Sequence, residues 1–166
     1  MLFLAPTIWG DFIVELTNNN EVLELNFPNQ RISQRIKEKN EKLGDELNRY
    51  FTGKSKKINL EYSVEKIKSG FDSKVLNEVL KIRYGEITTY SDISKKLYNS
   101  VKWTRAVGNA LKRNPLPIII PCHRIIRNDS FISGFSGGII WKKRLIELER
   151  GKKCIISRKG HYYLLS

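Results

Sequence analysis

The chain of 166 residues carries 30 Lys and Arg against 17 Asp and Glu, a formal net charge of +13 with a pI near 9.8. That length fits one ordinary domain or two small ones, and a hydrophobic fraction of 40% excludes wholesale disorder. No apolar run approaches the roughly 20 residues of a transmembrane helix. No basic region precedes the apolar N-terminus, so a secretory signal is not expected either.

The positive charge is concentrated in the C-terminal part of the chain. Residues 1–68 hold 11 basic and 10 acidic side chains, whereas residues 69–166 hold 19 basic and 7 acidic ones. Surplus lysine can merely solubilise a protein or belong to a high-temperature surface. The asymmetry instead favours a polyanion such as nucleic acid as the partner of the C-terminal part.

Residues 1–65 predict a small α/β domain that serves as a scaffold. Apolar and polar residues alternate over 7–16 and again over 21–27, with a run of asparagines between them, and this pattern predicts a β-hairpin. Helical spacing of apolar residues between 30 and 51 predicts one or two amphipathic helices, with Gly44 as an interruption.

The boundary between the two parts is expected near residue 65. Residues 58–64 predict a strand or an extended connection, and the Gly, Ser and Lys content nearby predicts a linker within residues 53–70. The second domain then covers residues 66–166.

The C-terminal domain is predicted to be mostly helical. An apolar stripe that follows Asp72 and Ser73, which can cap a helix, ends at Gly85. Two shorter helices are predicted next, over 92–98 with Ser91 as the N-cap and over 102–113. Two short helices joined by a tight polar turn in a basic region are typical of a helix-turn-helix. The fold class is therefore α+β, with a winged-helix-like C-terminal domain.

The second of these short helices has an unusually small face, formed by Ala106, Gly108 and Ala110. A glycine in a helix interior costs about 1 kcal/mol relative to alanine, so something else should require it. Close packing against another helix is one explanation. Contact with nucleic acid is the other, because a minor groove only about 6 Å wide admits a slim face.

A buried strand is predicted over 116–121, and it leads to the sequence Cys122-His123-Arg124. A thiol beside an imidazole and two arginines, the second being Arg127, is expected to have a lowered pKa. An inert core cysteine is the alternative. Cys154 has no histidine near it and is interpreted as a bystander. Two cysteines are too few for a structural zinc site, and residues 1–68 contain neither Cys nor His, so no zinc is expected.

The residues around Cys122 resemble the O6-alkylguanine-DNA alkyltransferase family. The sequence Ile-Pro-Cys-His-Arg-Ile is similar to the active-site signature of that family. Further segments resemble its helix-turn-helix block, its active-site loop and the helix that follows: these are residues 84–90, 105–110, 114–115, 135–138 and 145–149. The resemblance covers residues 70–150, whereas the first 65 residues match only in layout.

The resemblance implies roles for five catalytic residues. Cys122 would be the nucleophile that attacks the alkyl carbon on guanine O6. His123, acting through a water and oriented by Glu149, would take the thiol proton. Tyr90 would give a hydrogen bond or a proton to N3 of the leaving guanine, and Asn114 would brace the helix-turn-helix against the active site.

The resemblance also implies a DNA-binding face. The recognition helix would lie in the minor groove, and Arg105 would enter the base stack in place of a flipped nucleotide. The other expected DNA-binding residues are Thr89, Ala106, Gly108, Ala110 and Arg113. Asn109 stands where a second glycine is frequent in the family.

The substrate pocket that the resemblance implies has five members, Pro117, Ile125, Phe135, Ser136 and Gly137. The Ser136 N–H would meet guanine O6, and the carbonyls of Cys122 and Ile125 would accept hydrogen bonds from the exocyclic amine. Phe135 stands where a tyrosine is frequent.

The function implied by the resemblance is DNA repair. The alkyl group of O6-alkylguanine, and that of O4-alkylthymine, would pass irreversibly from duplex DNA to Cys122, once per molecule and without cofactor or metal. We expect a cytoplasmic, nucleoid-associated monomer, or a nuclear one in a eukaryote, with cooperative binding along DNA left open. The alternatives are a non-enzymatic alkyltransferase-like lesion sensor, a class that lacks the acceptor cysteine, and a plain helix-turn-helix protein with an inert thiol.

Overall fold

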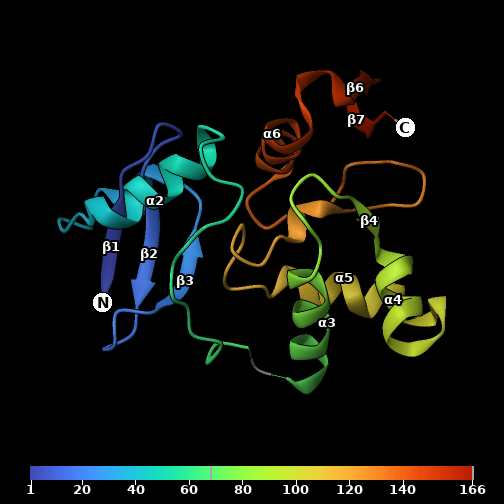
Figure 1. The fold of residues 1–166 in the computed structure, drawn as a ribbon, viewed down its shortest axis with the longest axis horizontal. Helices are drawn as coiled ribbons and strands as arrows, with labels where there is room; N and C mark the ends of the chain where they lie inside the picture. The colour runs from blue at the N-terminus through green and yellow to red at the C-terminus, as the bar shows by residue number, and fades with distance from the viewer. Residues whose placement is uncertain (68, 166) are drawn as a thin grey trace. The chain divides into compact units, whose positions relative to one another are not determined.

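An antiparallel sheet and a group of short helices belong to two separate units of the chain in the computed structural model, which describes residues 1–67 and 69–165 (Figure 1). The N-terminal unit comprises Met1–Lys66 with Pro115–Pro117, and the C-terminal unit comprises Ile67–Asn114 with Ile118–Ser166. This mixture of elements confirms the expected α+β class. In the described ranges, no helix combines the length and the apolarity needed to cross a membrane.

The sheet of the N-terminal unit contains three antiparallel strands in the order β1-β2-β3: β1 Leu2–Ala5, β2 Phe12–Leu16 and β3 Val22–Asn26. The predicted hairpin is confirmed as β2 and β3, although its first strand begins only at Phe12. β1 pairs with the other edge of β2 and was not predicted, because four residues are too few to show an alternating pattern.

Two helices complete this unit, α1 Gln30–Ser33 and α2 Glu41–Phe51. The prediction that Gly44 interrupts the helix is wrong, because α2 runs through it. A Cβ at Gly44 would lie 2.3 Å from the carbonyl oxygen of Pro6. The glycine therefore allows α2 to pass close to the chain before β2.

Four helices form the C-terminal unit: α3 Gly70–Leu80, α4 Tyr90–Tyr98, α5 Thr104–Lys112 and α6 Ile139–Arg150. Two predicted N-caps are wrong by a few residues. Ser69 caps α3 and Thr89 caps α4, and each side-chain oxygen accepts a hydrogen bond from a backbone N–H three residues later. Both helices therefore begin earlier than their apolar stripes indicated.

The predicted helix-turn-helix is present as α4 and α5. The chain turns at Asn99, which has φ of 50°, and continues into a short 3₁₀ helix, η1 Val101–Trp103. The rings of Phe71, Tyr98 and Trp103 pack together with centroid distances of 5.3 to 6.1 Å. This aromatic cluster fixes the turn between α4 and α5 against α3.

The segment that precedes Cys122 is buried, but it is not the predicted strand. It forms turns, and Ile118 lies at a positive φ of 76°. Prolines at 115, 117 and 121 remove backbone donors that a strand would need, which accounts for the irregular path. The segment ends in the 3₁₀ helix η2 Cys122–Arg124.

Short strands join the remaining parts of the C-terminal unit. β4 Thr88–Thr89 pairs in parallel with β5 Ile125–Ile126, directly after η2. The 3₁₀ helix η3 Lys152–Cys154 leads to a terminal hairpin of β6 Ile155–Arg158 and β7 His161–Leu164. The strand pair β4·β5 brings the start of α4 next to the residues that follow the cysteine.

Candidate active site

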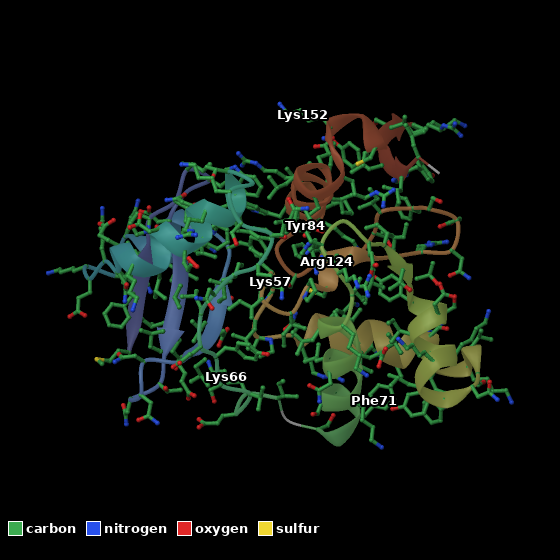
Figure 2. The ribbon with its side chains drawn as sticks, in the orientation of Figure 1. Lys57, Lys66, Phe71, Tyr84, Arg124 and Lys152 are labelled. Atoms are coloured by element: carbon green, nitrogen blue, oxygen red, sulfur yellow. The ribbon has the colours of Figure 1, made fainter. Side chains whose placement is uncertain are left out.

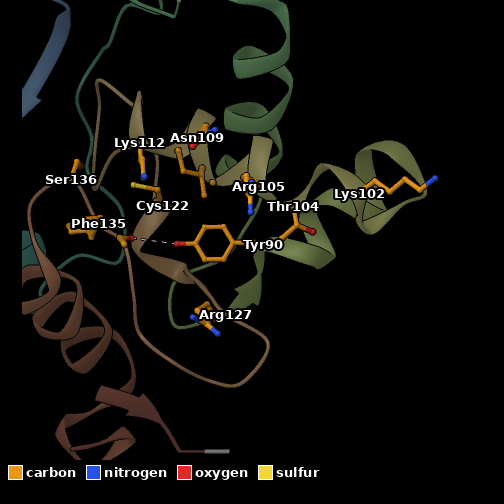
Figure 3. A pocket seen from close by; sticks show the side chains of 13 residues that line it. Tyr90, Lys102, Thr104, Arg105, Asn109, Lys112, Cys122, Arg127, Phe135 and Ser136 are labelled. Carbon is orange, nitrogen blue, oxygen red and sulfur yellow. Dashed lines mark hydrogen bonds between the residues drawn. The ribbon is translucent and has the colours of Figure 1, made fainter. Parts of the chain in front are cut away.

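A cavity of about 640 Å³ opens on the C-terminal unit, and Cys122 lies in its wall (Figure 3). α5 supplies one side of the cavity, and the loop before α6 supplies another. Its lining residues are Tyr90, Lys102, Thr104, Arg105, Gly108, Asn109, Leu111, Lys112, Cys122, Arg127, Gly134, Phe135 and Ser136. The structure thus brings together six residues that the sequence assigned to the catalytic site, the DNA-binding face or the pocket: Tyr90, Arg105, Gly108, Cys122, Phe135 and Ser136.

Three residues expected in the pocket are not among the described residues that line this cavity. Pro117 belongs to the N-terminal unit. Ile125 is fully buried, and its carbonyl oxygen accepts a hydrogen bond from Lys142 Nζ at 2.5 Å. Gly137 lies in the turn before α6. The described lining of the cavity therefore includes two of the five expected pocket residues, Phe135 and Ser136.

One of the expected DNA-binding residues needs correction. Ala110 is fully buried, so its methyl group cannot contact a partner. Arg113 does not line the cavity, and it donates to the Asp72 carboxylate at 2.6 and 2.7 Å. Thr89 serves as the N-cap of α4, whereas Ala106 remains partly exposed. Only part of the predicted small face is therefore accessible.

The Cys122 thiol is buried and contacts an amide. Asn114, just beyond the end of α5, donates from Nδ2 to the Ile120 carbonyl at 3.0 Å and to Cys122 Sγ at 3.2 Å. Burial raises the pKa of Cys122, although the Asn114 hydrogen bond and the Lys142 charge act in the opposite direction. The expected lowering of this pKa is wrong, because burial of the thiol outweighs these two effects and the guanidinium of Arg124 faces a carboxylate instead.

That carboxylate is Glu149 of α6. His123 Nε2 lies 2.6 Å from its Oε1, and Arg124 donates to it from Nε at 3.0 Å and from Nη2 at 3.0 Å. The Gly85 N–H adds a further hydrogen bond at 2.9 Å. Burial alone would raise the pKa of Glu149, but His123 and Arg124 lower it to about 2. Glu149 is therefore ionised and holds both side chains.

Arg124 is fixed from several directions. Its Nη1 donates to the Ile82 carbonyl at 2.7 Å. Its guanidinium lies over the Tyr84 ring, 5.9 Å from the centroid, and Figure 2 shows the two residues near each other. The arginine thus joins α6 to the loop before β4. It orients Glu149 rather than the thiol.

His123 is held in the neutral form with one nitrogen available. Burial lowers the pKa of His123, although Glu149 acts in the opposite direction. An ionised carboxylate can only accept, so Nε2 carries the proton in the hydrogen bond to Glu149. Nδ1 is then an acceptor, and within residues 1–67 and 69–165 it is buried without a hydrogen-bond partner.

Tyr90, the first residue of α4, lies in the cavity wall beside Gly108 of α5. Its hydroxyl donates weakly to the carbonyls of Ser133 and Gly134, each at 3.4 Å, and Figure 3 shows it pointing toward this loop. Burial raises the pKa of Tyr90 to about 12, with a smaller electrostatic contribution from Cys122. The phenol is therefore protonated and can donate at neutral pH.

Lys142 is a candidate site residue that the sequence reasoning missed. It is fully buried and donates from Nζ to the Ser133 carbonyl at 2.9 Å, in addition to that of Ile125. Burial lowers the pKa of Lys142 to about 8. Its position on the apolar stripe of α6, between Ile139 and Leu145, could have revealed it. Lys142 ties the loop wall of the cavity to the strand that follows Cys122.

Cations dominate the cavity edge. Lys102, Arg105, Lys112 and Arg127 line it, and no carboxylate does among the described residues. In Figure 3, Lys102 lies at the far edge and points away from the cavity. This surface favours an anionic partner.

The C-terminal unit is thus a helix-turn-helix module whose second helix borders a cationic cavity with a thiol in its wall. Residues 70–151 match the family model described as "6-O-methylguanine DNA methyltransferase, DNA binding domain". The chain belongs to this family.

Two curated relatives are methylated-DNA–protein-cysteine methyltransferases. That of Archaeoglobus fulgidus is 44% identical over 110 residues, 63% of this chain and 71% of the relative. That of Methanocaldococcus vulcanius is 53% identical over 85 residues, and the match spans 51% of this chain and only 50% of the relative. The crystal structure of Mycobacterium tuberculosis OGT in complex with DNA is similar with a TM-score of 0.76 and 27% identity, covering 91% of this chain and 93% of that one.

Proposed function

We propose that this protein repairs alkylated duplex DNA by transferring the alkyl group from guanine O6 to Cys122. The observation that carries the proposal is the position of the Cys122 thiol, in the wall of a cavity bordered by the second helix of a helix-turn-helix. The names of the relatives, which are methylated-DNA–protein-cysteine methyltransferases, support the same reaction.

The residues around Cys122 can perform the proton transfers that this reaction needs. The Sγ–carbon bond forms as the carbon–O6 bond breaks, and the electron pair of the broken bond stays on guanine. Because burial keeps the thiol protonated, its proton has to leave during attack, through a water to Nδ1 of neutral His123. The protonated Tyr90 hydroxyl donates to N3 of the leaving base, and the proton lost by the thiol balances the one that guanine gains.

Asn114, Glu149 and Lys142 position these groups. Asn114 holds the sulfur, and Glu149 fixes the tautomer and orientation of His123. Lys142 holds the loop that carries Ser136, and in the proposed reaction the Ser136 N–H donates to guanine O6. The same pocket chemistry would act on O4-alkylthymine.

Binding to the minor groove would explain the glycine at position 108 of α5. A Cβ at Gly108 would meet the Tyr90 ring at 3.9 Å, an ordinary contact, so packing inside the protein does not require the glycine. A helix that enters a groove about 6 Å wide does require it. The target atom lies within the duplex, so the base is flipped into the cavity and Arg105 fills the gap.

Each molecule is proposed to act once, as a monomer without cofactor. The product is a thioether, and none of the groups around Cys122 activates a carbon–sulfur bond for hydrolysis. The cationic face brings the protein to the nucleoid, or to the nucleus of a eukaryote.

Mass spectrometry after incubation with a duplex that contains O6-methylguanine tests the proposal. We expect one added methyl group on Cys122 in the wild type and in Cys154→Ala, and none in Cys122→Ala. Tight lesion binding without an adduct would support a lesion sensor instead. If the protein neither gains a methyl group nor prefers the lesion, it is a plain DNA-binding protein.

A further inference from the structure

One uncharged hydrogen-bonding side chain, Asn109, lies among the cations on the cavity face of α5. Arg105, Asn109 and Lys112 follow one another at intervals of four and three residues, so they share one side of the helix. Figure 3 shows Asn109 between the other two. Asn109 is exposed, and in residues 1–67 and 69–165 its amide group has no hydrogen-bond partner.

The other two residues of this face can only donate, and Thr104 stands apart at the start of the helix. The Thr104 hydroxyl donates to the Val101 carbonyl at 2.6 Å, at the start of the helix. Arg105 and Lys112 carry donors and no acceptor. Asn109 thus supplies a side-chain acceptor on the side of α5 that carries Arg105 and Lys112.

A side chain needs a hydrogen-bond acceptor to recognise a G·C pair in the minor groove. A·T and T·A pairs show only acceptors there, whereas a G·C pair adds the N2 amine of guanine as a donor. Arginine and lysine cannot accept from that amine, but an asparagine can accept from it and donate to a neighbouring acceptor.

We propose that Asn109 reads the guanine N2 amine of a base pair beside the lesion, so that repair is faster next to G·C than next to A·T. The inference rests on the proposed function, in which Arg105 occupies the place of the flipped nucleotide. Asn109 lies one helical turn from Arg105, about 6 Å along the axis, which corresponds to one or two base-pair steps of about 3.4 Å. Its amide therefore reaches the pairs that adjoin the lesion.

Single-turnover repair rates on duplexes with altered flanking pairs test the inference. Inosine·C replaces G·C on both sides of the lesion and removes only the minor-groove amine, whereas diaminopurine·T replaces A·T and adds it. One hydrogen bond contributes about 0.5 to 1.5 kcal/mol, so the amine is expected to raise the wild-type rate about 2- to 10-fold. In Asn109→Ala the amine effect should disappear.

Two control variants separate base reading from general binding. Lys112→Ala should lower the rate on all duplexes together and leave the amine effect unchanged. Asn77→Ala removes an exposed asparagine of α3 that does not line the cavity, and it should change neither quantity. Flanking pairs also alter the ease of flipping, but they do so equally in the wild type and in Asn109→Ala.

The result that would overturn the inference is an amine effect of the same size in the wild type and in Asn109→Ala, including no effect in either. Such a result leaves the proposed function intact as long as Cys122 becomes methylated. Failure of methyl transfer from every duplex would remove the proposed function as well.

Discussion

Replacing Gly108 by alanine should make the protein more stable and a poorer repair protein. The added methyl group meets only the Tyr90 ring, at 3.9 Å, so the fold accommodates it without strain. Alanine gains about 1 kcal/mol over glycine inside a helix. For a chain of this size, that corresponds to a melting temperature about 2 to 4 °C higher.

The same methyl group projects from the face that the proposed function places in the minor groove. Overpacking a close contact costs about 1 to 3 kcal/mol, which lowers the rate of duplex repair by about 5- to 150-fold. Thermal unfolding followed by circular dichroism, and single-turnover methyl transfer from a duplex, measure the two effects. Reaction with a free O6-alkylguanine base should change far less, because no groove is involved.

A matched glycine elsewhere provides the control. A Cβ at Gly70, in the first turn of α3, would meet nothing within 4 Å, and this residue does not line the cavity. Gly70→Ala should therefore leave duplex repair unchanged. A fall in the melting temperature of Gly108→Ala, or full duplex repair by that variant, would refute the reasoning.

Three further predictions concern charged residues. Lys112→Ala should reduce the slope of log DNA affinity against log salt concentration by about 0.9 and leave stability unchanged. Arg113→Ala should keep that slope and destabilise the fold by about 1 to 3 kcal/mol. The reverse pattern would contradict a phosphate contact by Lys112 and a structural role for Arg113. The lowered pKa of Glu149 contributes about 3 kcal/mol to the free energy of unfolding above pH 4.5, and this contribution is lost as the pH falls toward 2. In urea unfolding, Glu149→Gln should therefore be less stable than the wild type at pH 7 and about equally stable at pH 2. Arg105→Ala should slow duplex repair far more than reaction with the free base, and equal losses would disprove its role in flipping.

The helix-turn-helix was predictable from the sequence because local signals define it. Asn99 and Ser100 interrupt the helical pattern of a basic region, and the structure places the turn there. The caps were missed by a few residues because Ser69 and Thr89 stand outside the apolar stripes. The irregular segment around Ile118 was predicted to be a strand, because a short apolar run does not distinguish a buried strand from buried turns.

The candidate site was predictable in its residue types but not in its electrostatics. The neighbours of Cys122 in sequence are cationic, yet Arg124 and His123 face Glu149, which lies 25 residues from Arg124 in the chain. Lys142 was not predicted because a lysine side chain is rarely buried, even where it falls among apolar residues of a helix. Such pairings depend on tertiary contacts, which no local pattern encodes.

The most direct test of the account is the amount of methyl group transferred per molecule of protein when methylated duplex is in large excess. We expect a rapid rise to one methyl group per protein, all of it on Cys122, followed by a plateau that longer incubation does not change. A plateau at zero, transfer to Cys154, or a continuing rise would contradict it.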